Sequence, residues 1–280
     1  IRTYTNTYMT TSNDLNAGLD NLLAASTVQD GNGNSAALVQ NTFDNYAAGG
    51  LTAAPSVPNH DSNYGTNVTL RGLVTTQVTP ANTVTAKYDT TGMARSSSDG
   101  TTQVQITPDP STNTVPTAIT PNGSTALQTS IGYNGWLGPT SVTGPNNSTD
   151  SAIYDPIGRV SSTTSIYGAA TVYTYTAATS STPSTVEADV EDNGYTKVRY
   201  TLTTLDGFGR PARVERGSFS GATKSPVSWT DTQYVACGCS PLGKMGAVSE
   251  PYTPKGALVW AHRYQYDGLG RTTQETLGTG

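Results

Sequence analysis

The chain has 280 residues and a net charge of −5, with only 12% charged and 34% hydrophobic residues. Its 15 Lys and Arg residues are scattered, so the sequence offers no basic surface for nucleic acid, and it contains no run of roughly 18 apolar residues that would span a membrane. Tyr outnumbers Phe by 16 to 3, and Thr, Ser, Gly and Asn dominate. Because Thr and Tyr favour strands while Gly, Pro and Asn favour turns, we predict a folded, all-β chain.

The N-terminal part begins with alternating Thr and Tyr residues between Thr3 and Tyr8, which predicts a strand at the very start. We therefore expect an excerpt of a longer protein. Leu residues recur with helical spacing after Ser12, which would cap a short helix confined to residues 12–25, although a loop with inward Leu side chains fits equally well. Residues 30–34 predict a hairpin turn, followed by a returning strand over residues 38–46.

Further strands are predicted where β-branched and aromatic residues alternate with small polar ones. Residues 47–62 and the Pro-rich stretch 107–121 predict loops, the second with edge strands because Pro cannot donate to a ladder. The predicted strands lie within residues 63–75, 84–88, 104–107, 170–177, 196–205, 227–235 and 258–266. No shift in composition marks a boundary, so we predict one continuous β-array over residues 1–280.

A short motif recurs three times in the C-terminal half of the chain. Each copy has a large apolar residue, Asp, two variable residues, Gly and Arg: Tyr154-Asp155-x-x-Gly158-Arg159, Leu205-Asp206-x-x-Gly209-Arg210 and Tyr266-Asp267-x-x-Gly270-Arg271. Asp accepts hydrogen bonds from backbone N–H groups of a turn, and Gly adopts positive φ without steric cost. Each copy therefore predicts a tight β-hairpin, and degenerate copies without the Arg occur at residues 88–92 and 133–138.

This repeated motif resembles that of the RHS family, or YD-repeat proteins, which includes bacterial secreted toxins, insecticidal toxin complexes and animal teneurins. The resemblance implies that successive hairpins add side by side into a sheet that spirals into a hollow shell or winds as a tube, enclosing or securing a toxin domain. Many members carry a self-cleavage segment around Asp-Pro-x-Gly. Residues 155–158 match it superficially, but Arg159 continues the ordinary repeat, so we predict no autoprotease.

Several residues raise the question of a chemical site. Cys237 and Cys239 offer only two ligands where zinc needs four, so we expect no metal and an unpaired or partly oxidised pair, with His60 and His262 as further ligand candidates if zinc were found. Neither His lies near a nucleophile elbow, so no hydrolytic triad is indicated. Asp30, Asn32 and Asn34 have calcium-loop spacing, but no carboxylate follows between Ser35 and Phe43, which favours a plain turn. The acidic cluster Glu187, Asp189, Glu191 and Asp192 is interpreted as a solvated hairpin end.

The resulting expectation is a secreted or cell-surface structural protein rather than an enzyme, without cofactor, whose partners are neighbouring repeats or an enclosed toxin domain. The alternative is a carbohydrate- or cell-surface-binding module that uses exposed Tyr residues together with Trp136, Trp229 and Trp260 as stacking platforms. Within the motif, we expect the residue before each Asp to face inward against the neighbouring hairpin. We expect each Gly to have positive φ or to be crowded by a neighbouring backbone, and each Arg to bind carbonyls or an Asp of an adjacent hairpin.

Overall fold

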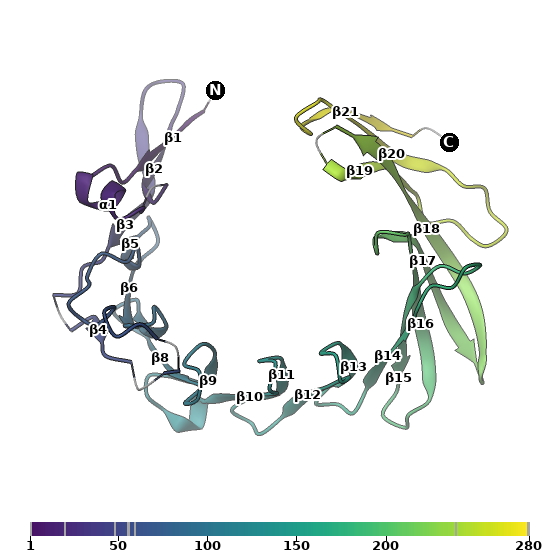
Figure 1. The fold of residues 1–280 in the computed structure, drawn as a ribbon, viewed down its shortest axis with the longest axis horizontal. Helices are drawn as coiled ribbons and strands as arrows, with labels where there is room; N and C mark the ends of the chain where they lie inside the picture. The colour runs from purple at the N-terminus through teal and green to yellow at the C-terminus, as the bar shows by residue number, and fades with distance from the viewer. Residues whose placement is uncertain are drawn as a thin grey trace. The chain divides into compact units, whose positions relative to one another are not determined.

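The computed structural model describes residues 2–19, 21–47, 49–54, 57–58, 60–238 and 240–278. The chain divides into two compact units, Ile1–Ser148 and Thr149–Gly280. Both consist almost entirely of antiparallel hairpins in curved sheet, which confirms the predicted fold class (Figure 1). The expectation of one continuous array across the two units stays a prediction.

The first unit contains β1 to β11 and two short helical segments. Its elements are β1 (Thr3–Tyr8), α1 (Ser12–Asn16), β2 (Leu23–Gln29), β3 (Ser35–Phe43), β4 (Leu51–Thr52), β5 (Val74–Val78), β6 (Thr83–Asp89), β7 (Ala94–Ser98), β8 (Gln103–Pro108), β9 (Pro116–Pro121), η1 (Thr125–Leu127), β10 (Thr129–Tyr133) and β11 (Pro139–Thr143). Each strand pairs with the next in an antiparallel ladder, except around β4.

Strand β4 is a two-residue exception that runs parallel to β6, with Leu51 opposite Tyr88. The β5–β6 ladder extends along β6 only to Thr85, so β4 pairs with the end of β6 that β5 does not reach. The helical expectation was correct in place but too long. The helix starts after Thr11, whose hydroxyl accepts from the Asp14 N–H, so Thr11 and not Ser12 is the cap.

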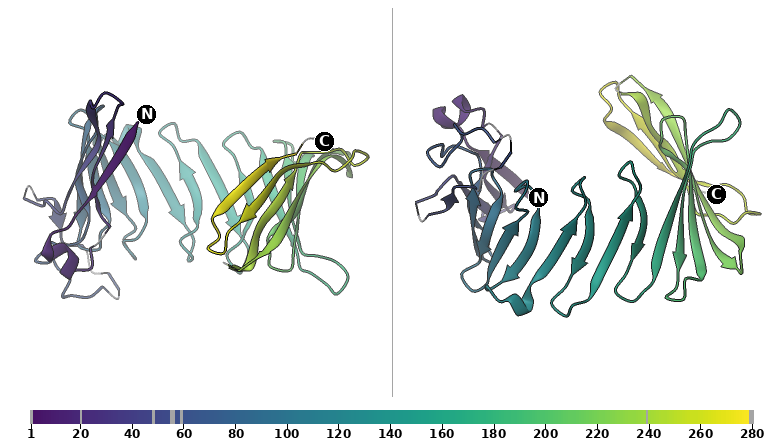
Figure 2. Two further views of the ribbon diagram at one scale, coloured as in Figure 1. Left: turned by 90° about the horizontal axis from the view of Figure 1, so that it is seen from above. Right: turned by 60° about the horizontal axis from the view of Figure 1, so that its bottom comes forward.

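The second unit contains strands β12 to β21. They are β12 (Thr149–Tyr154), β13 (Val160–Thr164), β14 (Ala170–Thr176), β15 (Thr185–Glu191), β16 (Lys197–Leu205), β17 (Pro211–Ser220), β18 (Thr223–Cys237), β19 (Ser240–Ser249), β20 (Trp260–Tyr266) and β21 (Thr272–Leu277). These strands also pair in chain order and antiparallel, and Figure 2 shows the long strands side by side in green.

Strand β18 is long enough to belong to two ladders. Its first part, up to Asp231, pairs with β17, whereas its second part, from Thr232, pairs with β19. The two ladders therefore lie one after the other along β18, and β18 connects β17 to β19 within the sheet.

Complete burial of apolar side chains is rare. Among the described residues, only Ala170, Tyr200 and Ala247 are buried hydrophobic residues. A sheet built from residues of which only 34% are hydrophobic cannot close a large core, so cross-strand pairs and turn hydrogen bonds carry much of its stability. The described helices include none that is long and apolar enough to cross a membrane.

Candidate functional site

The recurring motif folds into one defined five-residue turn. The Asp155 N–H donates to the Arg159 carbonyl at 2.8 Å, and the Gly158 N–H donates to the Asp155 carbonyl at 3.0 Å. The Asp155 carboxylate accepts from the N–H groups of Ile157 and Arg159 at 3.1 and 2.9 Å. Asp155 and Arg159 are the two ends of the turn, and the three residues between them form the hairpin loop. Its last residue, Gly158, is left-handed with φ of 86°, and a bulge follows where the strands begin to pair.

The other two full motifs form the same turn. Gly209 and Gly270 have φ of 76° and 79°, which agrees with the expectation for these glycines. The residues before the Asp occupy one register position, because Tyr154, Leu205 and Tyr266 each pair with the residue that follows the turn, directly after a shift in register. All three are half-buried. Their predicted stacking against the next hairpin stays a prediction for Tyr154 and Leu205.

The same backbone turn is more frequent than its sequence motif. Within the described residues, nine turns share both backbone hydrogen bonds, and the six without the full motif begin at Asp30, Asp89, Asn134, Gly144, Ser165 and Asp192. Their fourth residues, all with positive φ, are Gly33, Gly92, Leu137, Asn147, Gly168 and Tyr195. The sequence indicated the first three of these turns. The turns at 144, 165 and 192 carry a weaker signal, because Asn147 and Tyr195 adopt the left-handed conformation without Gly, and Gly144 and Ser165 replace the Asp.

The arginines of the motif bind the aspartate of their own turn. The Nε–H groups of Arg159, Arg210 and Arg271 donate to Asp155, Asp206 and Asp267 at 2.7, 2.8 and 2.6 Å. The expected bond to an Asp of an adjacent hairpin was therefore wrong, because the i,i+4 spacing across the turn already brings the two side chains together.

The expected bond to a carbonyl of another hairpin is confirmed for Arg210 alone among these three, because it also donates to the Leu242 carbonyl in β19. The side-chain hydrogen bond from Arg210 lowers the pKa of Asp206, and backbone and side-chain hydrogen bonds from Arg271 lower the pKa of Asp267. The carboxylates of the motif are thus held ionised by their own turns.

The tie between neighbouring strands is made by tyrosine. Tyr175 of β14 donates its hydroxyl hydrogen to the Val160 carbonyl of β13 at 2.9 Å, and the guanidinium of Arg159 lies 4.1 Å from the centroid of its ring. The Tyr234 hydroxyl likewise donates to the Pro211 carbonyl at 3.2 Å, and the guanidinium of Arg210 lies 3.8 Å from the centroid of the Tyr234 ring. In each case the cation directly precedes the residue whose carbonyl accepts the bond. We call this arrangement the tyrosine clasp.

A third clasp uses Lys in place of Arg. Tyr266 donates to the Met245 carbonyl at 2.8 Å, and Lys244 Nζ lies 5.1 Å from the ring centroid. Tyr88 and Tyr133 make the same hydroxyl bond, to the carbonyls of Val74 and Pro116, each at 2.8 Å. Among the described residues, no Lys or Arg lies over the rings of Tyr88 and Tyr133.

All five tyrosines occupy one place relative to the ladder that they extend. The β13–β14 ladder ends with the pair Ser162 and Val172. The hydroxyl bond joins Val160, two residues before Ser162, to Tyr175, three residues after Val172. The same offset follows from the last pairs of the other four ladders, which are 76/85, 118/130, 213/231 and 247/263. The hydroxyl therefore satisfies a carbonyl just where the two strands part and the backbone ladder stops.

The acidic cluster is a solvated hairpin end only at Asp192, which is exposed and begins the turn to β16; Asp189 and Glu187 on β15 do not fit that interpretation. Asp189 is only 4% exposed and accepts from Lys197 Nζ at 2.6 Å, while Glu187 pairs with Lys224. The Asp189 Oδ1 atom is buried and has no donor among the described residues. Alternation along β15 places both acids on the face that Tyr200 also occupies, because Asp189 lies directly opposite Tyr200.

This face continues as a network of acids and aromatic rings across β16, β17 and β18. Glu215 accepts from the Tyr200 hydroxyl at 2.6 Å and from the Trp229 Nε1–H at 2.7 Å. Arg213 holds Asp231 with two parallel bonds of 2.6 and 2.8 Å, and its guanidinium lies 4.8 Å from the Trp229 ring. Burial and the bond to Glu215 raise the pKa of Tyr200, so its hydroxyl stays protonated and donates.

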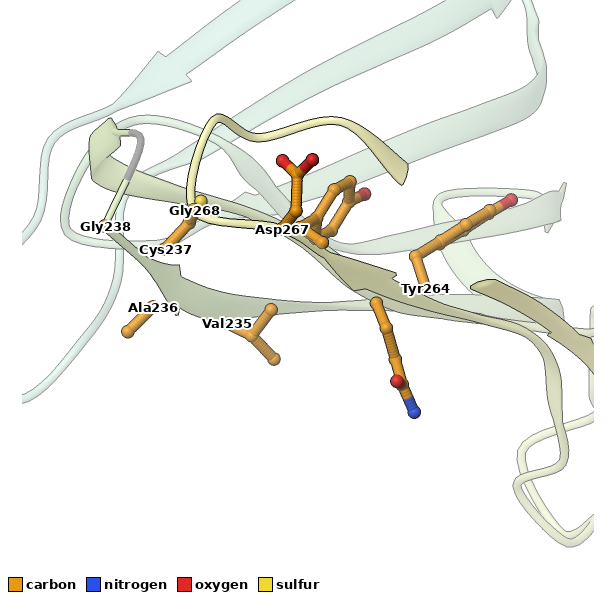
Figure 3. Close-up of a pocket in the computed structure, with 9 residues that line it drawn as sticks. Val235, Ala236, Cys237, Gly238, Tyr264, Asp267 and Gly268 are labelled. Carbon is orange, nitrogen blue, oxygen red and sulfur yellow. The ribbon is translucent and has the colours of Figure 1, made fainter. Parts of the chain in front are cut away.

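A pocket of about 340 Å³ lies where the end of β18 faces the last repeated turn (Figure 3). Val235 to Gly238 form one side, and Tyr264 to Gly268 form the other. Cys237 is disulfide-bonded, so of the two expected states the unpaired thiol is wrong for this residue, while Cys239 lies outside the described residues.

Metal ligands do not gather in the part of the chain that the structure describes, where no group of three or more His, Cys, Asp or Glu side chains could hold an ion. His60 Nε2 lies 3.2 Å from the Thr90 carbonyl, and His262 Nδ1 lies 2.7 Å from Glu275. The Asp30 carboxylate is occupied by its own turn, with bonds of 2.9 Å from the N–H groups of Asn32 and Asn34, which is the plain turn that the sequence favoured over a calcium loop.

Comparison with known proteins gives only distant structural similarity. No protein-family model and no curated protein matches the chain. The Tc holotoxin pore of Photorhabdus luminescens is 12% identical over 98% of this chain and 14% of that chain, with a TM-score of 0.36. A TcdB2–TccC3–Cdc42 structure is 10% identical over 100% of this chain and 17% of that chain, also with a TM-score of 0.36. A porin-like protein from Bacteroides uniformis is 11% identical over 71% of this chain and 82% of that chain, with a TM-score of 0.31.

The chain thus spans less than a fifth of the length of these two toxin chains. Similarity at this level of identity and TM-score does not establish membership of a family.

Proposed function

We propose that the chain is a structural repeat array of the RHS type, a segment of an extracellular β-shell or filament that encloses or presents a cargo or toxin domain. The observation that carries this proposal is the repetition of one turn and one tyrosine contact at a fixed register, described above. A repeat scaffold gains length and curvature by adding equal structural units, each of which contacts its neighbours. The array itself has no catalytic activity in this proposal.

The distribution of charge supports a scaffold rather than a reactive surface. The turn aspartates are bound by backbone N–H groups, and the network of β15 to β18 pairs its acids with Lys, Arg, Tyr and Trp partners. Side chains committed to such bonds keep the strands in register and are poor candidates for proton transfer. The disulfide at Cys237 supports an oxidising location such as the cell exterior.

A carbohydrate-binding module has less support from the arrangement of aromatic rings. Of the three Trp residues, only Trp136 is a largely exposed one, at 72%. The Trp229 ring packs edge-on against Tyr252 at 5.8 Å and donates to Glu215. A stacking platform needs several exposed ring faces in one place, and these rings are dispersed.

Electron microscopy of the purified protein tests the scaffold proposal. Hollow particles or tubes are the expected result, and compact solid particles would overturn it. Limited proteolysis adds a second readout, because any enclosed domain should resist protease until the array is opened with urea. A cargo domain that is digested at the same rate before and after opening would show that the array does not enclose it.

A further inference from the structure

A second pocket, of about 690 Å³, lies in the first unit and is unrelated to the repeated turns of the second unit. Four aliphatic side chains, those of Leu19, Val68, Leu70 and Leu73, form its apolar wall, while Asn16 and Thr91 add polar side chains. Tyr64 adds an aromatic ring, and Arg71 is the charged residue among the lining side chains. A volume between about 300 and 1,000 Å³ with mostly apolar walls and few polar groups is typical of small-molecule sites.

Arg71 fixes the shape of this pocket. Its Nε–H donates to the Val68 carbonyl at 2.7 Å, and Nη1 donates to the Thr90 carbonyl at 2.7 Å. Nη2 donates to the carbonyls of Tyr64 and Gly65, both at 2.8 Å. One guanidinium therefore holds the loop that carries the wall residues, and the pocket exists before any ligand binds.

The backbone on the other side of Arg71 is held by Asp44. The Asp44 carboxylate accepts from the N–H groups of Arg71, Gly72 and Leu73 at 2.8, 2.7 and 3.0 Å, and also from the Tyr46 hydroxyl at 2.7 Å. These four donors commit both oxygen atoms of Asp44. The carboxylate therefore orders the loop without forming an ion pair with the guanidinium.

The charge of the Arg71 side chain has no ion-pair partner among the described residues. Its four hydrogen bonds within the described residues all go to neutral carbonyls. A guanidinium has five N–H groups, so one Nη1 hydrogen remains for another acceptor. A half-buried cation at the edge of an apolar pocket interacts more strongly with an anion than an exposed one does. Two of the lining side chains are also large exposed apolar ones, Tyr64 at 55% and Leu70 at 42%.

We propose that this pocket binds a small molecule with an apolar body and a carboxylate head. The body would lie against Leu19, Val68, Leu70 and Leu73, and the carboxylate would accept the remaining Nη1 hydrogen of Arg71. A charge-assisted bond of this kind is stronger than a neutral one, whereas an amine would be repelled and a neutral alcohol would lose the charge term. One edge of the pocket is the repeated turn that begins at Asp89, because Thr91 and Gly92 line it, but ligand binding here is not part of the scaffold function.

A ligand series on the unaltered protein gives the primary test. Isothermal titration calorimetry below the micelle-forming concentration would compare decanoate, decanol and decylamine. We expect one decanoate to bind per chain, decanol to bind at least tenfold more weakly, and decylamine not to bind. Equal binding of decanoate and decanol, or no binding of decanoate, would overturn the proposal.

Two matched variants locate the site. Leu70→Asp places a negative charge on the half-exposed wall of the pocket, so we expect it to weaken decanoate binding at least tenfold. Leu127→Asp is the control, because Leu127 is also in the first unit and is 49% exposed but does not line the pocket. Decanoate binding that is unchanged in Leu70→Asp, or equally lost in both variants, would assign the ligand to another place. If Leu70→Asp does not fold, the ligand series still decides.

Discussion

The guanidinium of Arg210 lies 3.8 Å from the ring centroid of Tyr234, a residue of β18. Arg210 closes the turn that precedes β17, and Tyr234 lies in the part of β18 that has already left β17 to pair with β19. The contact therefore holds two strands together beyond the end of their common ladder. A cation over an aromatic face contributes roughly 0.5 to 2 kcal/mol, depending on how far water is excluded.

The tyrosine hydroxyl should have a measurable share in this tie. Tyr175→Phe removes the bond to the Val160 carbonyl but keeps the ring under Arg159, so we expect a loss of about 1 kcal/mol in the free energy of unfolding. Tyr195→Phe is the control, because that side chain is 77% exposed at a turn. Urea denaturation of both variants measures the difference, and equal stabilities would show that the hydroxyl bond contributes nothing.

The left-handed glycine of the motif should be limited by its backbone alone. A Cβ at Gly209 would meet nothing within 4 Å, yet φ is 76°. Gly209→Val should therefore cost about 1 to 3 kcal/mol of stability through backbone strain. Gly207→Val tests the same side chain in the same turn, where space is also open and φ is not positive, and it should cost less.

A second variant at position 209 separates backbone conformation from side-chain size. Gly209→Asn should be tolerated better than Gly209→Val, because Asn147 already occupies the equivalent place with φ of 61°. Thermal unfolding ranks the three variants. If the Val and Asn variants at position 209 are equally stable, positive φ is not the limiting factor.

The motif aspartates should make stability depend on pH in the acid range. The side chain of Arg210 lowers the pKa of Asp206 in the folded chain, so the unfolded chain binds more protons and stability rises with pH. The contribution is complete above the unfolded pKa of about 4 and is lost as the pH falls through the lower folded pKa. Asp206→Asn should therefore be less stable than the unaltered protein at neutral pH, and the gap should close under strongly acidic conditions. A gap that persists at low pH would mean that the amide distorts the turn.

The redox state of Cys237 is accessible to direct chemical measurement. Because Cys237 is disulfide-bonded, iodoacetamide should label it only after reduction, as read by mass spectrometry of the peptide that contains it. Denaturation with urea, without a reductant, is the control that separates a disulfide from a buried thiol. Labelling in urea alone would contradict the disulfide.

Sequence reasoning located the turns because their chemistry is local. The five-residue turn places Asp206, Gly209 and Arg210 within reach of one another, so the spacing of the three residues suffices to predict the hairpin. Local reasoning also explains its omissions. At residues 192–196 the backbone makes the same turn with Tyr195 in the left-handed position, and a bulky residue there gives no signal in the sequence.

The partners of the motif residues depended on how the strands pair. The spacing across the turn already favours the Arg–Asp bond within one hairpin, but the sequence did not show that tyrosine, and not arginine, ties the hairpins. That tie depends on where each ladder stops, because Tyr175 and Tyr234 reach the carbonyl two residues before the last paired one.

In the same way, Asp189 was expected in solvent because four acids lie close together in sequence. Strand pairing instead places it opposite Tyr200 and within reach of Lys197. Turn chemistry is fixed over five residues, whereas ladder length and face are fixed only when the whole sheet has formed.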